Sequence, residues 1–233
     1  MKIRAIPAFS DNYIWFIQVG NEVLVVDPGE AQGVEEYLKE NSLALGGILL
    51  THNHEDHIGG VERLLHVYPE TPVFGPAEVI KFAHHIVEEG NTFQILGLKF
   101  EVLGTGGHTQ GHISYLLEDK LFCGDALFVG GCGRNFTGDL SLQYNDLQKL
   151  KELPDNTEIY AAHEYSLGNL KFAQSILPEN KAIAEAISIV EEKLSRGQVT
   201  MPTTIEQEKT YNPFLLAENL EEFTERRKAK DNF

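Results

Sequence analysis

Hydrophobic residues in the first half of the chain occur in short runs, several of which alternate with polar residues, and such runs predict β-strands. Gly, Asn, Asp and Pro separate the runs, as is typical of turns. Residues 33–40 and 60–68 instead carry apolar residues at helical spacing. The mixture predicts a layered α/β architecture. The predicted strands are residues 13–19, 22–27, 47–51, 93–103, 112–117 and 120–123.

The pattern changes after about residue 165, where helical spacing of apolar residues replaces the strand-like runs. Thr204 and Gln207 match a capping box, and a last helix is expected over residues 216–228. We therefore predict a mixed α/β domain over residues 1–165 and a helical C-terminal subdomain over residues 166–233. The apolar positions are Leu167, Leu170, Ala173 and Leu177, followed by Ile183, Ile187, Val190 and Leu194.

Charge and composition restrict the classes of partner. The formal net charge of -16 disfavours nucleic acid and anionic membranes as partners. Two cysteines, Cys123 and Cys132, are too few for a disulfide framework. No signal-like start or membrane-spanning apolar run is found, so we expect a cytoplasmic protein. Against this acidic background, residues 226–230 form a local concentration of positive charge.

Residues 51–60, Thr-His-Asn-His-Glu-Asp-His-Ile-Gly-Gly, place three imidazoles and the carboxylate of Asp56 close together between a predicted strand and a predicted helix. In extended backbone His52 and His54 point the same way, so both could bind one ion, while the next turn directs Asp56 and His57 toward a neighbouring ion. Imidazole and carboxylate ligands suit catalytic zinc, iron or manganese. The alternative is a solvated polar loop.

Three further residues complete a plausible ligand set. His108 lies in Gly-rich sequence, which lets backbone approach an ion closely. Asp125 and His163 each follow an apolar run and are expected just beyond the carboxyl end of a strand. Single polar residues at strand ends are common, and these three gain weight only beside the first cluster.

These motifs resemble the metallo-β-lactamase superfamily and, within it, the glyoxalase II family of hydroxyacylglutathione hydrolases, over essentially the whole chain. The later motifs distinguish this family from the wider superfamily. The resemblance rests on residues 51–60, 107–113, 124–125, 131–134, 163–165, 169–173, 212–214 and 227–231.

The resemblance implies an αββα metallo-β-lactamase sandwich as the catalytic domain, with the helical subdomain binding substrate. It implies two divalent metal ions, with zinc first and iron or manganese as alternatives, and catalytic roles for Asp56 and Asp125. One metal would be held by His52, His54 and His108, the other by Asp56, His57 and His163, with Asp125 bridging both. The implied contacts to glutathione are Arg134, Tyr165, Arg227 and Lys230.

The implied reaction is hydrolysis of the thioester S-D-lactoylglutathione, or a related S-2-hydroxyacylglutathione, to glutathione and D-lactate by a metal-bridging hydroxide. This is the second step of methylglyoxal detoxification. We expect a monomer whose partner is this small glutathione thioester. The chain departs from the family where Lys and Tyr are frequent, having Arg134 and Phe136, and where Pro is usual, having Gly106.

Several alternatives stay open. The same ligands serve lactamases, lactonases and mononuclear-iron persulfide dioxygenases, and a noncatalytic metal-binding protein could keep the scaffold. Arg227 and Lys230 could instead stabilise a helix C-terminus. Tyr165 could be a packed core residue. Among the other histidines, a solvated position is expected for His66, His84 and His85, and a supporting role without a metal for His112.

Overall fold

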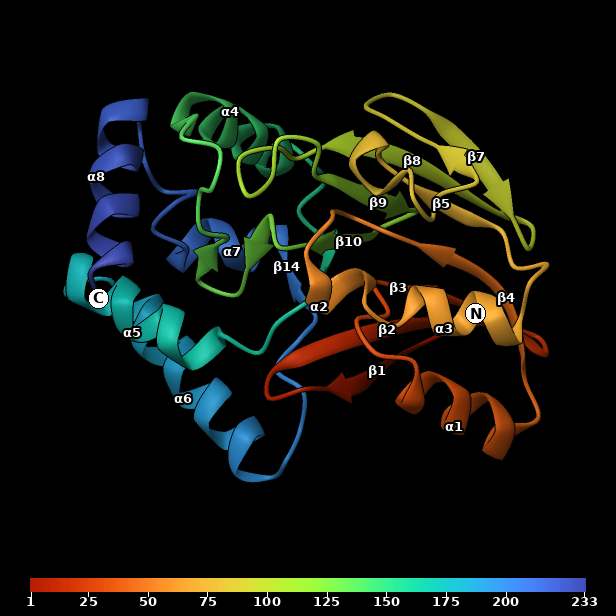
Figure 1. Cartoon of the computed structure of the whole chain (residues 1–233). Coiled ribbons are helices and arrows are strands. Elements are labelled where there is room, and N and C mark those ends of the chain that lie inside the picture. Colours follow the sequence, from red (N-terminus) through yellow and green to blue (C-terminus); the bar gives the residue numbers. More distant parts are fainter. The chain divides into compact units, whose positions relative to one another are not determined.

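The computed structural model describes residues 1–233, which divide into two compact units (Figure 1). The first unit comprises Met1–Gly104 and Gly111–Glu118, and the second comprises Thr105–Gln110 and Asp119–Phe233. Neither limit falls at residue 165, and the domain boundary predicted there stays a prediction.

A six-stranded sheet in the order β1-β2-β3-β4-β5-β6 forms the centre of the first unit. β1, β2 and β3 pair antiparallel, and β3 to β6 pair parallel. The predicted strands at residues 13–19, 22–27 and 47–51 correspond to β2, β3 and β4, whereas β1 was not predicted. The strands are β1 (Lys2–Ala8), β2 (Asn12–Val19), β3 (Glu22–Val26), β4 (Ala44–Leu49), β5 (Val73–Gly75) and β6 (His85–Ile86).

Three further strands of the first unit form an antiparallel run, β7 (Thr92–Ile95), β8 (Leu98–Gly104) and β9 (Ile113–Leu117). The single strand predicted over residues 93–103 is wrong, because Leu96 and Gly97, with φ of 51° and 77°, form a tight turn that divides it into a hairpin. The buried Tyr115 of β9 connects this run to the first sheet, since its hydroxyl donates to the Leu50 carbonyl at 2.7 Å.

Helices pack against the first sheet in this unit and bury one of its faces. α1 (Gln32–Asn41) and α3 (Val61–Val67) contribute Val34, Leu38 and Leu64 to the same core as Phe16 and Val25. Both helices match the predicted residues 33–40 and 60–68. The short helix α2 (Glu55–Ile58) follows β4, and a 3-10 turn spans Ala77–Val79.

The second unit contains β10 (Lys120–Gly124), which pairs parallel with β13 (Glu158–Ala161), as expected for two runs that each precede a candidate ligand. β14 (Thr203–Thr204) extends β13 antiparallel, and β11 (Leu127–Phe128) pairs with β12 (Gly131–Cys132). α4 (Leu140–Lys151) was not predicted, although Asp139 caps it by accepting from the Leu142 N–H at 2.8 Å.

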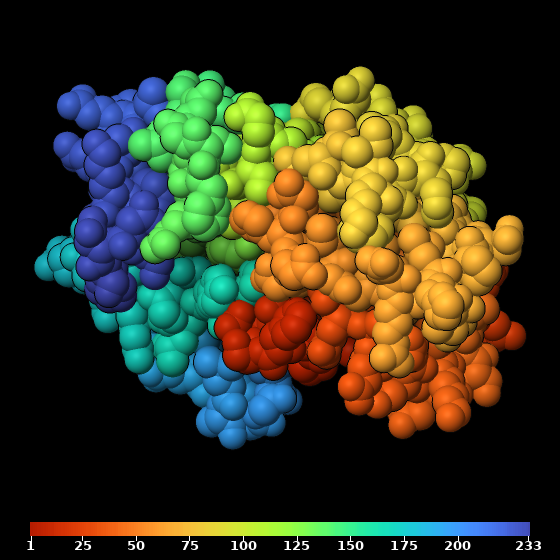
Figure 2. Space-filling view, viewed as in Figure 1, coloured from red at the N-terminus to blue at the C-terminus, as the bar shows by residue number.

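The helices expected after residue 165 are present: α5 (Ser166–Ile176), α6 (Lys181–Ser195), α7 (Ile205–Tyr211) and α8 (Leu220–Asp231). The capping box of Thr204 and Gln207 begins α7 as predicted. α8 begins later than the expected residue 216 because the Asn219 side chain caps it at Glu222 N–H. The blue atoms of α8 border the green atoms around α4 in the space-filling view (Figure 2).

A buried carboxylate connects α7 to the loop between β11 and β12. Glu208 is fully buried and accepts hydrogen bonds from Gly130 N–H at 3.0 Å and Asn212 Nδ2 at 2.9 Å. Its other oxygen accepts from the hydroxyls of Thr203 at 2.8 Å and Tyr211 at 3.0 Å. Burial raises the pKa of Glu208 to about 7, although the donors oppose the shift.

This pKa predicts a specific dependence of stability on pH. Because folded Glu208 holds its proton more tightly than the unfolded chain does, its contribution is complete below about pH 4.5 and is lost as pH rises through about 7. The integrated effect is about 3 kcal/mol. Urea unfolding between pH 5 and 8 should show this loss in the wild type and not in Glu208→Gln. Parallel pH profiles for the two proteins would contradict the assignment.

Candidate metal centre

The first unit carries four of the predicted ligands in the segment after β4. His52 and His57 are fully buried, while His54 and Asp56 are partly exposed. His52 Nε2 lies 3.0 Å from His54 Nδ1, so the two imidazoles converge as strand alternation predicts. The His52 and His57 ring centroids are 4.1 Å apart. Imidazole nitrogens that converge in this way are close enough to share an ion, and they are typical ligands of divalent transition metals.

Asp27 orients this segment, although it was not among the residues predicted to belong to the site. Its carboxylate accepts from Thr51 N–H at 2.8 Å and from the Thr51 hydroxyl at 2.6 Å, and lies 3.0 Å from His57 Nδ1. A carboxylate at Nδ1 favours the tautomer in which Nε2 carries the metal-binding lone pair. The available signal was that Asp27 follows an apolar strand, as Asp125 does.

Asn12, the first residue of β2, orients Asp56. Its amide nitrogen donates to Asp56 Oδ2 at 3.0 Å and reaches the Asp56 carbonyl at 3.4 Å. Asp56 Oδ2 also lies 3.5 Å from His57 Nε2. The Asp56 carboxylate is therefore positioned on the same side of the segment as the imidazole of His57.

The other histidines of the first unit differ in burial. His112 is almost fully buried, and its ring centroid lies 4.8 Å from that of His52, which fits the expected supporting role. His66 is exposed on α3, and His84 and His85 are exposed, as expected for solvated side chains. His85 nevertheless belongs to the short β6 and stacks on Phe74 at 4.4 Å.

The second unit brings together the three remaining predicted ligands. Asp125 Oδ2 lies 3.2 Å from His108 Nε2, and Asp125 Oδ1 lies 3.3 Å from His163 Nε2. All three side chains are at least nine-tenths buried. Asp125 and His163 meet because β10 and β13 are parallel neighbours, so their carboxyl ends share one edge. A carboxylate that directs one oxygen to each of two imidazoles has the form of a bridging ligand.

Backbone contacts set the orientation of His108. Its Nδ1–H donates a hydrogen bond to the Arg134 carbonyl at 2.9 Å, which leaves Nε2 directed at Asp125. Gly133 permits this approach, because a Cβ at that position would lie 2.0 Å from the Asp125 carbonyl oxygen.

Aromatic residues border the ligands of the second unit. Tyr165 stacks on His163, with ring centroids 4.7 Å apart and an interplanar angle of 6°. Its side chain is 41% exposed, so the fully packed core position considered as an alternative does not apply. Phe136 is 61% exposed and its ring lies 5.3 Å from that of His108, edge to face.

The cationic side chains predicted to contact glutathione lie in two environments. Arg227 is buried, donates to the Cys132 carbonyl at 2.9 Å and pairs with Asp231 at 2.9 Å. Arg134 has a side chain 57% exposed, with Nε 3.5 Å from Asp231. Burial lowers the pKa of Lys230, and the neighbouring Arg227 adds to the effect. The three cations thus lie around the C-terminal part of α8 and the segment after β12.

Comparison with known proteins gives these clusters a family context. Residues 8–163 match the model of the metallo-beta-lactamase superfamily, and residues 164–233 match that of the hydroxyacylglutathione hydrolase C-terminus. A hydroxyacylglutathione hydrolase from Haemophilus ducreyi is 50% identical over 234 residues, covering 100% of both chains. One from Vibrio cholerae serotype O1 is 48% identical, covering 92% of this chain and 86% of its own.

Among solved structures, ETHE1 from Myxococcus xanthus superposes with a TM-score of 0.75 at 29% identity, covering 98% of this chain and 90% of its own. The predicted fold class, a metallo-β-lactamase sandwich of α/β type with a helical C-terminal part, is confirmed. The two family models match adjacent parts of the chain, and a relative that covers the whole chain is 50% identical in sequence. The chain therefore belongs to the hydroxyacylglutathione hydrolase family of the metallo-β-lactamase superfamily.

Proposed function

We propose that this protein is a thioester hydrolase that converts S-D-lactoylglutathione and related S-2-hydroxyacylglutathiones to glutathione and the free hydroxy acid. The observation that carries the proposal is the pairing of a metallo-β-lactamase part with a hydroxyacylglutathione hydrolase C-terminus in one chain. The full-length relatives named hydroxyacylglutathione hydrolase support the same substrate class. The reaction would be the second step of methylglyoxal detoxification.

We assign two divalent metal ions to the seven ligands, all of which lie within the matched residues 8–163. The donor set supports this assignment, since neutral imidazoles and carboxylates are the ligands that zinc, iron and manganese share. Zinc is our first choice. The proposed sets are His52, His54 and His108 for one ion, Asp56, His57 and His163 for the other, and Asp125 for both.

Bound divalent ions would lower the pKa of a bound water toward neutrality and would polarise the thioester carbonyl. The roles of the chain's own residues follow from their contacts. Asp27 and the Arg134 carbonyl hold the Nδ1 protons of His57 and His108, so that each Nε2 is available as a ligand. Asn12 restrains the Asp56 carboxylate, which is suited to orient the attacking water. The leaving thiolate needs little acid assistance because thiols are far more acidic than alcohols.

We assign recognition of the glutathione part to Arg134, Tyr165, Arg227 and Lys230. Carboxylates of glutathione would pair with the three cations Arg134, Arg227 and Lys230, among which the Arg134 guanidinium is the most exposed. Arg227 also holds the backbone after β12 through the Cys132 carbonyl, so its loss would disturb more than one contact.

Arg134→Ala therefore gives the cleaner test of substrate binding. The variant keeps the Arg134 carbonyl that holds His108, so metal content should not change. We expect KM to rise about tenfold with kcat nearly unchanged, as for the loss of one charge-assisted contact made equally in ground and transition states. Arg196→Ala, which removes a similarly exposed arginine paired with Glu192, serves as the control. Equal KM values for the two variants would remove Arg134 from the site.

Cellular location and assembly are further proposals. None of the helices is long and apolar enough to span a membrane. We propose a cytoplasmic monomer that acts on this small thioester and has no nucleic-acid or membrane partner, in keeping with its net charge of -16.

The decisive experiment measures the loss of thioester absorbance of S-D-lactoylglutathione with metal-loaded and chelated protein, together with metal content. We expect turnover that disappears on chelation and returns with zinc. A protein that binds two metals without hydrolysing the thioester would overturn the proposal. Oxygen consumption with a glutathione persulfide, combined with one bound iron, would indicate a persulfide dioxygenase instead.

A further inference from the structure

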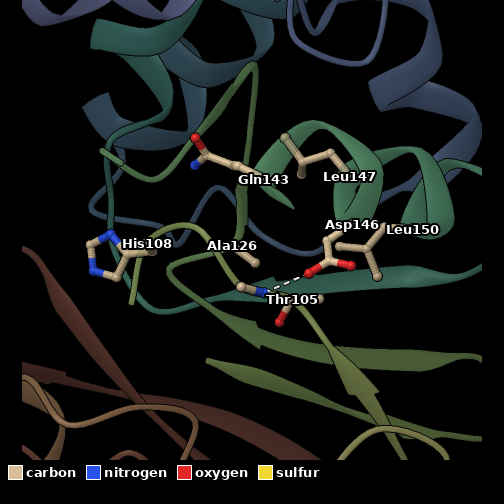
Figure 3. A pocket seen from close by; sticks show the side chains of 8 residues that line it. Thr105, His108, Ala126, Gln143, Asp146, Leu147 and Leu150 are labelled. Atoms are coloured by element: carbon tan, nitrogen blue, oxygen red, sulfur yellow. Dashed lines mark hydrogen bonds between the residues drawn. The ribbon is translucent and has the colours of Figure 1, made fainter. Parts of the chain in front are cut away.

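One side of α4 packs against the segment that carries His108, within the second unit. Figure 3 shows Gln143 and Asp146 projecting from α4, with Asp146 beside Thr105, and His108 farther along the segment that carries Thr105. The narrow pocket that these residues line with Ala126 has no room for a water molecule. Contacts across it are therefore direct.

Asp146 holds the backbone two residues before His108. Its Oδ2 accepts from Gly106 N–H at 2.8 Å, the bond marked in Figure 3, while its Oδ1 lies 3.1 Å from Lys149 Nζ. A proline at position 106 would lack this N–H. A Cβ at Gly106 would also approach Leu142 Cδ2 to 2.7 Å, so α4 is in close contact with this backbone.

Gln143 holds the segment that orients the His108 ring. Its buried amide donates from Nε2 to the Gly133 carbonyl at 2.8 Å and accepts from Asn135 Nδ2 at 3.2 Å. Gly107, with φ of 114°, packs on the same side chain, because a Cβ there would lie 2.4 Å from Gln143 Cβ. Gln143 therefore contacts both the His108 loop and the segment after β12.

These two contacts restrain His108 from both directions. Gly133 directly precedes Arg134, whose carbonyl lies 2.9 Å from His108 Nδ1. If the Gly133 peptide shifts, the acceptor that selects the His108 tautomer shifts with it. If Gly106 shifts, the ring moves relative to Asp125, 3.2 Å from its Nε2. The two side chains of α4 thus contact both backbone segments on which the place of the imidazole and the position of its proton depend.

We propose that Gln143 and Asp146 are positioning residues that set the location and tautomer of His108, so that α4 tunes metal affinity without contacting the metal. The proposal rests on the assignment of His108 as a ligand in the proposed function. Residues that support metal-binding histidines typically change metal affinity 10- to 100-fold when replaced. We expect an effect of this size on one of the two zinc sites.

The test is a zinc competition titration of the full chain against a chromophoric chelator. Gln143→Leu and Asp146→Ala should each weaken one zinc dissociation constant about 10- to 100-fold. Asp146→Asn keeps an oxygen for Gly106 N–H and should restore most of the affinity. Gln148→Leu is the matched control, because it makes the same change in α4 at a side chain whose Nε2 has no hydrogen-bond partner.

Long-range proton–nitrogen NMR of the metal-free protein, in which no bound ion fixes the tautomer, gives a second readout. His108 should carry its proton on Nδ1 in the wild type and in Gln148→Leu, and should lose that single tautomer in Gln143→Leu. A purely structural role would lower the melting temperature and leave the tautomer and zinc affinity unchanged, which would overturn the proposal.

His108→Ala separates this proposal from the ligand assignment. If His108→Ala weakens zinc binding and the α4 variants do not, the positioning proposal fails and the ligand assignment stands. If His108→Ala leaves both dissociation constants unchanged, the ligand assignment fails and the positioning proposal fails with it.

Discussion

Asp125→Ala is expected to lower kcat/KM by more than about a hundredfold. Replacing a residue that only supports a metal ligand lowers activity by up to about a hundredfold, and the loss of a ligand should exceed this. Asp125 directs one oxygen toward His108 and the other toward His163, so its loss removes the negative charge between two imidazoles. Without that charge, the repulsion between two cations held close together is no longer offset. We therefore expect the variant to retain fewer than two metal ions.

Metal analysis and steady-state kinetics on the same preparations test this expectation. Asp155→Ala is the control, because Asp155 is 66% exposed and pairs only at the surface with Lys209. Asp125→Asn keeps the size of the side chain and removes its charge, and should also lose metal. A fully active Asp125→Ala protein that retains two metals would exclude Asp125 as the bridging ligand.

Asp27→Ala should have the largest effect on stability, about 3–5 kcal/mol lost from the free energy of unfolding. The variant leaves the buried donors of Thr51 and His57 without their acceptor, and each such loss costs about 1–3 kcal/mol. The tautomer of His57 is no longer selected, so zinc affinity should fall about 10- to 100-fold as well.

Urea unfolding of the metal-free proteins separates the two effects of Asp27, because metal binding no longer contributes. Thr51→Val removes the hydroxyl bond to Asp27 and the hydroxyl's 3.0 Å contact with His52 Nδ1, and should cost about 1 kcal/mol while keeping His57 oriented. If Asp27→Ala unfolds at the wild-type urea concentration, Asp27 does not organise the segment after β4.

The local sequence pattern was sufficient to predict candidate metal ligands where these are neighbours in the chain or follow a recognisable strand. His52, His54 and His57 belong to one short segment, and strand alternation alone predicts that the first two converge. Asp125 and His163 follow apolar runs that prove to be the parallel neighbours β10 and β13. The helices α5 and α6 were predictable because each buries one face at a regular spacing.

Tertiary structure alone decided how those ligands are held. Asp27 meets His57 across 30 positions, Glu208 meets Gly130 across 78, and Arg227 meets Cys132 across 95. The turn that divides residues 93–103 depends on a positive φ at Leu96, which an apolar run does not reveal. The sequence determines which residues can bind metal because ligand chemistry belongs to the side chain. Their orientation depends on hydrogen bonds between distant segments, which arise only when strand register and helix packing bring those segments together.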